Sequence, residues 1–219
     1  MHITTCFHSL NILILAPLFL IVHLRISLCD NSLYVPSDNI AVDCGSNSPG
    51  NLSYIGRKWT PDIGSGFIFS TSGNKSVTSK ASSMSRSVPE VPYLTARIFR
   101  SQFTYNFNVT PGPKFIRLHF YPSAYMGLNA SKAFLTVTAN SAGRRYTLLH
   151  NFSASLVADY FKEPILVREF IVHVSGNALD ITFAPTSNAS YGFVNGIEVV
   201  SMPLNLYIRG AHVPLPLVG

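Results

Sequence analysis

Two stretches of strictly alternating residues constrain the fold of this chain most. Apolar side chains occupy every second position in 103–109, and the same alternation returns in 116–121. A period of two places successive side chains on opposite faces of a strand, so each stretch predicts a strand with one buried face. The segment between them, Pro111-Gly112-Pro113, predicts a turn that joins the two as a pair. The expected packed core consists of Phe103, Tyr105, Phe107, Ile116, Leu118 and Phe120.

Further short runs of strand-forming residues are separated by turn residues along the rest of the chain. Residues 145–149 follow 133–139 closely enough to form a hairpin with it. Strands at intervals of roughly ten residues predict an all-β fold, an antiparallel β-sandwich of jelly-roll type. The other expected strands are Asn39–Cys44, Ile165–Val174, Leu179–Phe183 and Tyr191–Val200.

Two segments are expected to differ from this pattern, and one aromatic residue outside the strands is expected to be buried. Gly64–Arg86 is rich in Ser, Thr and Gly, which predicts a long surface loop. Phe152–Phe161 fits either one or two helical turns or an irregular loop with buried aromatic residues. The single tryptophan, Trp59, is expected to fill the core because an indole ring buries a large area.

The first 29 residues have the layout of a secretory signal peptide. Residues 10–24 are mostly apolar and uncharged, a length below the roughly 20 residues that a comfortable membrane span needs. Small residues precede Asp30, so we expect cleavage after Cys29, with an uncleaved anchor as the alternative. We expect one domain over 30–203 and a Pro-rich tail over 204–219 that ends before any second domain.

Cysteine usage and glycan acceptors agree with the secretory pathway. Cys6 and Cys29 fall in the signal segment, so Cys44 has no intrachain disulfide partner and is either buried or paired with another chain. Asn108 also begins an Asn-X-Ser/Thr sequon, but Pro111 follows its Thr110 and makes it the least suitable acceptor. The expected N-glycosylation sites are Asn51, Asn74, Asn129, Asn151 and Asn188.

The sequence carries few signs of catalysis. It has no Gly-X-Ser-X-Gly elbow, no phosphate-binding glycine loop and no His-Glu-X-X-His pair. His119, His150 and His173 lie in separate segments, and the one local acidic pair, Asp159 and Glu163, suits a solvated helical face. The formal net charge of +6 is scattered and forms no nucleic-acid stripe. We therefore expect no enzyme activity, no cofactor, no metal and no nucleic-acid partner.

Several consecutive motifs resemble the malectin-like domain family. More narrowly, the chain is similar to the first of the two malectin-like domains in the ectodomain of plant FERONIA-type (CrRLK1L) receptor-like kinases. The resemblance covers about 33–203 and omits the kinase of those receptors. The motifs that carry it are AVDCGS, VPEVPYLTARIFRSQFTY, FIRLHFYP, YTLLHNFSAS, VREFIVHV and GFVNGIEVVSMP.

This resemblance implies a secreted or cell-surface domain in the apoplast. It implies recognition of cell-wall carbohydrate such as pectin, with the binding of a secreted signalling peptide or co-receptor as the alternative. Sugars are bound by aromatic faces and a few placed polar groups. The candidate ligand-binding residues are Tyr121 and Tyr125, beside the loop after the second alternating strand, and Tyr191 and Asn195 in the last strand. The same tyrosines could instead serve packing at strand ends.

Overall fold

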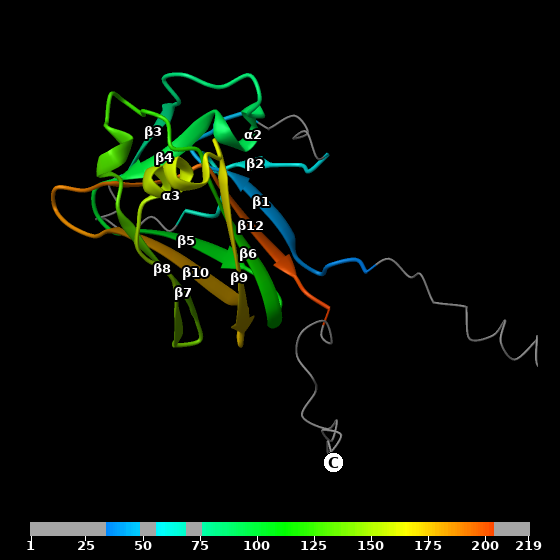
Figure 1. Ribbon diagram of the computed structural model, residues 1–219. Coiled ribbons are helices and arrows are strands. Elements are labelled where there is room, and N and C mark those ends of the chain that lie inside the picture. The colour runs from blue at the N-terminus through cyan, green and yellow to red at the C-terminus, as the bar shows by residue number, and fades with distance from the viewer. Residues whose placement is uncertain (1–33, 49–55, 69–75, 204–219) are drawn as a thin grey trace, which may run out of the picture. The chain divides into compact units, whose positions relative to one another are not determined.

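The computed structural model describes residues 34–48, 56–68 and 76–203 (Figure 1). Contacts divide the chain into Met1–Val35 and Pro36–Gly219, and every element below belongs to the second unit. The expected signal peptide, the tail over 204–219 and the sequons at Asn51 and Asn74 lie outside the described residues. These expectations therefore stay predictions.

The largest sheet has five strands in the order β2-β1-β12-β6-β9. All neighbours in it pair antiparallel except β1 and β2, which are parallel. The edge strand β2 has only two residues, Thr60 and Pro61. The bounds are β1 Asn39–Asp43, β2 Thr60–Pro61, β6 Gly112–Phe120, β9 Leu166–Val174 and β12 Gly196–Ser201.

A second sheet has four antiparallel strands in the order β5-β10-β7-β8. Its β7 and β8 form the hairpin that the sequence predicts. The strand predicted over 179–183 is also confirmed, because Leu179, Ile181 and Phe183 of β10 all point into the core. The bounds are β5 Phe103–Asn108, β7 Leu135–Ser141, β8 Arg144–Phe152 and β10 Ala178–Pro185.

A third sheet of three strands, in the order β11-β4-β3, completes the strand arrangement. Its edge strand β3, Ser76–Lys80, falls inside the expected loop over 64–86, so that prediction is wrong in part. Polar residues form β3 because its neighbour β4, rather than its own side chains, supplies the apolar surface. The other bounds are β4 Thr95–Phe99, β11 Gly192–Val194, α2 Glu90–Tyr93, η1 Ala130–Lys132 and α3 Ala154–Phe161.

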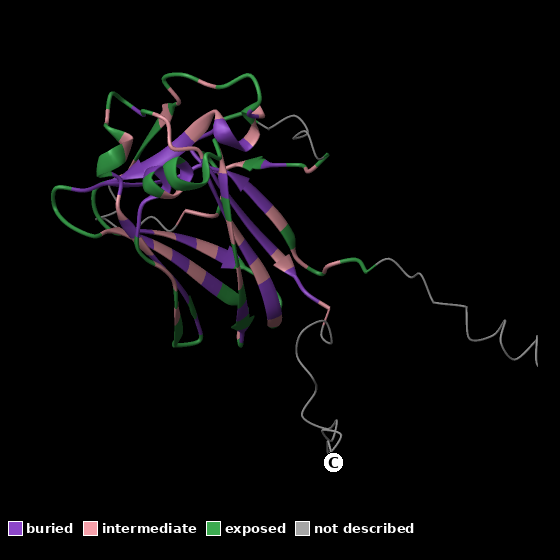
Figure 2. Cartoon of the chain, viewed as in Figure 1, coloured by how far each residue is buried: buried purple, intermediate pink, exposed green. Residues whose placement is uncertain are grey.

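The alternating stretches form the core as predicted, but they do not pair with each other. All six expected core residues are at most 1% exposed (Figure 2). Burial alternates along β5, whereas in β6 His119 is buried as well. However, β5 pairs with β10, whereas β6 pairs with β12 and β9. Gly112 and Pro113 already belong to β6, so the chain passes from one sheet to another at 109–111. The result is an antiparallel β-sandwich whose sheets share one hydrophobic cluster that also contains Cys44.

The strand predicted over Tyr191–Val200 is broken at Asn195. Residues before it form β11 and residues after it form β12, which belong to different sheets. At the break, the Asn195 main-chain N–H donates to the His119 carbonyl (3.0 Å), and its carbonyl accepts from the Cys44 N–H (2.8 Å). Asn195 is thus the residue at which the chain changes sheets.

Gly45 is required by both its conformation and its surroundings. Its φ is +82°, and an added Cβ would lie 2.4 Å from the main-chain oxygen of Ala96. We expect Gly45→Ala to lower the free energy of unfolding by about 2–3 kcal/mol, because the clash adds to the strain of the left-handed conformation. Gly64 has a φ of +79° but no described atom within 4 Å of such a Cβ. Gly64→Ala should therefore cost only about 1 kcal/mol, and equal losses in urea unfolding would contradict the steric argument.

Candidate functional site

An open cavity of about 490 Å³ lies between the loop that follows β6 and the end of α3. The loop contributes 121–124, and the helix end contributes a mixture of small and charged side chains. A nearby serine loop closes the third side. The lining residues are Ser83, Tyr121, Pro122, Ser123, Ala124, Ala158, Asp159, Lys162, Glu163 and Pro164.

Hydrogen bonds fasten the two loops of the cavity to each other. The Tyr121 hydroxyl donates to the Ser83 carbonyl (3.3 Å) and accepts from the Ser85 N–H (3.2 Å). The Ser82 N–H and hydroxyl both donate to the Ala124 carbonyl, at 2.9 and 2.7 Å. Loops tied in this way lose little conformational freedom on binding a ligand, so this side of the cavity is pre-organised.

The second wall of the cavity, α3, confirms the helical alternative for Phe152–Phe161. The helix buries only small side chains, those of Ala154, Ser155 and Ala158. It ends at Lys162, whose φ of 58° is left-handed, and the Glu163 N–H donates back to the Ala158 carbonyl (3.2 Å). Asp159 and Glu163 are exposed at this end, as expected for a solvated helical face.

Three of the four predicted ligand-binding residues meet in one hydrogen-bond network. The side-chain oxygen of Asn195 accepts from the Tyr121 N–H (2.7 Å). Its amide nitrogen donates to the Thr95 carbonyl (2.7 Å) and to the Tyr125 hydroxyl (2.8 Å). The Tyr125 hydroxyl in turn donates to the Tyr121 carbonyl (2.8 Å), and burial raises the pKa of Tyr125 so that it stays a neutral donor. The network positions the start of the cavity loop.

The fourth predicted residue, Tyr191, lies apart from the cavity lining. It is 2% exposed, and its hydroxyl donates to the Asn129 carbonyl (3.2 Å). Tyr125 and Asn195 are fully buried, so Tyr121 is the one member of the predicted set that lines the cavity. Ligand binding by these four residues stays a prediction. Tyr121 can contact a ligand directly, whereas Tyr125 and Asn195 can only position the cavity loop. The contribution of α3 was missed because its packing beside the loop is a long-range contact.

Removing the Tyr125 hydroxyl tests this network. We expect Tyr125→Phe to lower the free energy of unfolding by about 1–2 kcal/mol, because the buried Asn195 amide loses an acceptor. The Tyr121 carbonyl loses one donor but still accepts from the Ser123 N–H (2.8 Å). Tyr191→Phe is the matched control, since the Asn129 carbonyl still accepts from the Lys132 N–H (3.0 Å). Its cost should stay below about 1 kcal/mol. Urea unfolding followed by far-UV circular dichroism measures the free energy of unfolding of both variants. A larger loss of stability in Tyr191→Phe than in Tyr125→Phe would refute the assignment.

The sequons that the structure describes are exposed. Asn129, Asn151 and Asn188 all lie at the surface. The side-chain oxygen of Asn129 accepts from the N–H (3.0 Å) and hydroxyl (2.8 Å) of Ser131, which leaves its amide nitrogen, the atom that carries a glycan, facing outward from these contacts. Their glycosylation stays a prediction.

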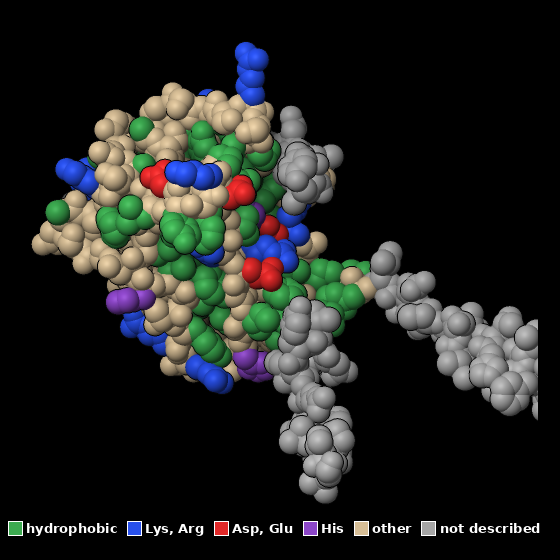
Figure 3. All heavy atoms as spheres, in the orientation of Figure 1, with side chains coloured by type: hydrophobic (Ala, Val, Ile, Leu, Met, Phe, Trp, Pro, Cys, Tyr) green, Lys and Arg blue, Asp and Glu red, His purple; other side chains and the backbone are tan. Residues whose placement is uncertain are grey.

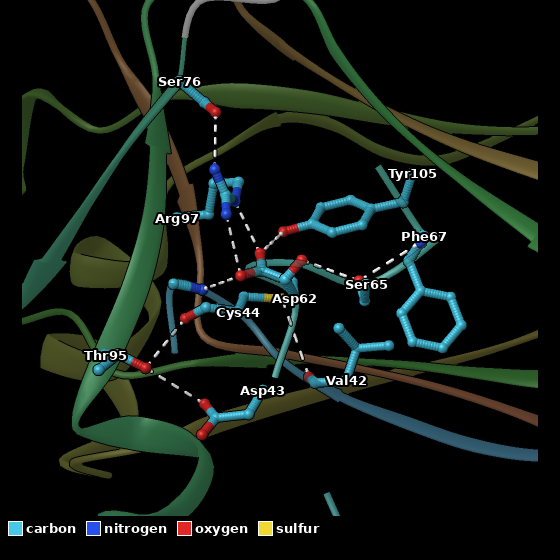
Figure 4. A network of polar contacts seen from close by, with 11 residues as sticks. Val42, Asp43, Cys44, Asp62, Ser65, Phe67, Ser76, Thr95, Arg97 and Tyr105 are labelled. Carbon is cyan, nitrogen blue, oxygen red and sulfur yellow. Dashed lines mark hydrogen bonds and ion pairs between the residues drawn. The ribbon is translucent and has the colours of Figure 1, made fainter. Parts of the chain in front are cut away.

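A buried polar network around Asp62 lies inside the sandwich (Figure 4). Arg97 donates to both carboxylate oxygens of Asp62, at 2.6 and 2.9 Å. The Tyr105 hydroxyl (2.7 Å) and the Gly45 N–H (2.9 Å) donate to the same carboxylate. Four donated bonds satisfy this charge within the protein, so the network is a structural unit closed to ligands.

A second carboxylate, Asp43, lies beside this network and has no cationic partner among the residues that the structure describes. It is buried, and its Oδ1 accepts from the Thr95 hydroxyl (3.2 Å). Burial, reinforced by the negative charge of Asp62, raises the pKa of Asp43 to about 7. Cys44 is free and fully buried, as one of the two alternatives predicted, and burial raises the pKa of its thiol. Trp59 is buried as predicted.

We searched residues 34–48, 56–68 and 76–203 for groups of metal-ligating side chains and for membrane-spanning helices. No group of three or more His, Cys, Asp or Glu in these ranges could hold a metal ion. His119 instead lies between Glu198 (2.8 Å) and the Tyr93 hydroxyl (2.9 Å). No helix within the same ranges is long and apolar enough to cross a membrane.

The fold and the cavity thus define the class of this chain as an antiparallel β-sandwich domain with an open surface cavity and internally satisfied polar networks. The chain belongs to the malectin-like domain family, because the family model for the malectin-like domain matches residues 42–218. It is 46% identical over 172 residues to the receptor-like protein kinase FERONIA of Arabidopsis thaliana, covering 78% of this chain and 19% of the relative. The chain thus spans about a fifth of the length of that curated relative.

Solved structures place the similarity in receptor ectodomains. A crystal structure of the plant peptide RALF23 in complex with FER and LLG2 matches with a TM-score of 0.67 and 44% identity, over 78% of this chain and 41% of the other. The ANX2 ectodomain from Arabidopsis thaliana matches with a TM-score of 0.68 and 34% identity, over 76% and 42%. The matched stretch therefore corresponds to part of the ectodomain of these receptors.

Proposed function

We propose that this module recognises a secreted peptide together with a co-receptor at the outer face of the plasma membrane. The observation that carries the proposal is the similarity to FER, which has been solved in complex with the peptide RALF23 and with LLG2. The pre-organised cavity between the Tyr121 loop and α3 is a concave surface of the kind that binding partners use.

Recognition of cell-wall carbohydrate has weaker support from the cavity. Sugar sites rely on exposed aromatic faces, and Tyr121 is the single aromatic side chain that lines this cavity. Two carboxylates, Asp159 and Glu163, line it against one cation, Lys162, so the charge of the lining is on balance unfavourable for a polyanion such as pectin. The peptide and co-receptor reading is therefore preferred to the pectin reading.

Binding measurements on the full secreted chain separate the two readings. The chain is titrated with RALF23, with LLG2, with both together, and with oligogalacturonides, at low and at high salt. We expect a saturable complex with the peptide and LLG2 and no saturable binding of oligogalacturonides. Saturable sugar binding that disappears in Tyr121→Ala, with no peptide complex, would overturn the proposal.

A further inference from the structure

Helix α3 exposes its large apolar residues and buries its small ones. Tyr160 is 80%, Phe161 60% and Leu156 55% exposed, on a helix of eight residues. The rings of Tyr160 and Phe161 lie edge to face, with centroids 4.9 Å apart. Figure 3 shows hydrophobic side chains gathered on the face over which α3 runs. An apolar cluster of this kind marks a surface that another molecule covers.

Two carboxylates beside this cluster have no cation partner in the described part of the chain. Asp159 lies in the last turn of α3 and Glu163 lies just beyond its left-handed cap, and both line the cavity. Neither takes part in a described ion pair. Four other described carboxylates each have such a partner. These are Asp38 with Lys114, Asp62 with Arg97, Glu169 with Arg117, and Glu198 with Arg57.

We propose that this surface binds a cationic peptide segment in which Lys or Arg stands next to aliphatic or aromatic side chains. The α3 surface is defined as Leu156, Asp159, Tyr160, Phe161 and Glu163. The inference rests on the proposed peptide-binding function and assigns it a place and a chemistry. The two carboxylates receive the cationic groups, and the three apolar side chains cover the apolar part of the segment.

The occupant follows from charge and from the geometry of the cavity. Long Lys and Arg side chains reach into a cavity with their charged ends while their stems cover apolar surface. Tyr160 and Phe161 offer ring faces and edges to the same cations and to apolar side chains. An acidic peptide or polysaccharide would meet two carboxylates, Asp159 and Glu163, against one cation, Lys162. Lys162, which lies between them, lowers the attraction and serves as an internal test of it.

A selection from a random-peptide display library against the full secreted chain tests the proposal. We expect the enriched peptides to combine Lys or Arg with aliphatic or aromatic residues, and their binding to weaken at high salt. Asp159→Asn with Glu163→Gln should weaken the best selected peptide about tenfold, and Tyr160→Ser with Phe161→Ser by a similar factor. Lys162→Gln should strengthen the same peptide, which no loss of folding could imitate.

Matched controls keep the outcomes distinct. Glu90→Gln removes an exposed carboxylate outside the cavity, and Ile171→Thr removes an exposed apolar side chain on β9; both should leave affinity unchanged. Enrichment of acidic peptides, or equal affinity in the wild type and all α3 variants, overturns the inference but leaves peptide binding intact. If the wild type binds neither a library peptide nor RALF23 with LLG2, the proposed function fails as well.

Discussion

Replacing Asp62 with alanine should lower the free energy of unfolding by about 3–5 kcal/mol, enough to prevent secretion of much of the chain. The substitution leaves the Arg97 guanidinium buried, with 8% of its side chain exposed, and without a counter-charge. The Tyr105 hydroxyl and the Gly45 N–H lose their acceptor at the same time. Urea unfolding of refolded protein and the secreted yield measure the effect.

Two further variants separate the loss of the ion pair from general damage. Arg97→Met in the Asp62→Ala background removes the unpaired charge. The loss of stability in the double variant should therefore be about 0.5–3 kcal/mol smaller than the sum of the losses in the two single variants. Glu169→Ala breaks an ion pair with Arg117 that is largely in solvent and should cost at most about 1 kcal/mol. Strict additivity in the double variant would exclude coupling between Asp62 and Arg97.

Stability should fall as the pH rises from about 4 to about 7, because of Asp43. The pKa of this carboxyl is about 7 in the folded protein and 3.8 in the unfolded chain. Between these two pH values the folded chain keeps a proton that the unfolded chain has released. Folding therefore loses about 1.4 kcal/mol for each pH unit within this window, and about 4 kcal/mol over all of it. Above pH 7 the contribution of Asp43 becomes constant.

The difference between wild type and Asp43→Asn isolates this effect. An amide resembles the protonated carboxyl, so the variant should match the wild type near pH 4 and exceed its stability by up to about 4 kcal/mol at pH 8. Asp38 acts in the opposite direction: burial alone would raise its pKa, but hydrogen bonds from Lys114, Thr110 and Ser201 lower it to about 2. Its contribution is lost below pH 4 in both proteins and cancels. Parallel stability curves from pH 4 to 8 would disprove the role of Asp43.

Local patterns predicted the strands well but not their neighbours. Alternation in 103–109 and 116–121 identifies the buried face of each strand, and the structure buries those faces. The partner of a strand depends on the path of the whole chain, so the prediction that these two stretches pair with each other is wrong: they lie in different sheets. The break at Asn195 was missed for a related reason: residues on both sides of it are buried and suit a strand.

The candidate site was predictable only in its loop. Tyr121 was singled out from its place after an alternating strand, and it lines the cavity. The sequence does not reveal that the polar groups of Tyr125, Tyr191 and Asn195 form hydrogen bonds inside the protein rather than with a ligand. The helix that forms the opposite wall contributes through a long-range contact, which no local pattern of 154–161 encodes.

The pairing of β1 with β12 determines how the module responds to tension. Asn39 lies opposite Val200 and Asp43 opposite Gly196, so the first and last described strands run side by side with their outer ends together. A pull applied between those ends separates the ladder one residue pair at a time, since the hydrogen bonds lie across the strands and along the pulling direction. The module therefore resists stretching between its two ends only weakly, and it yields first along this seam.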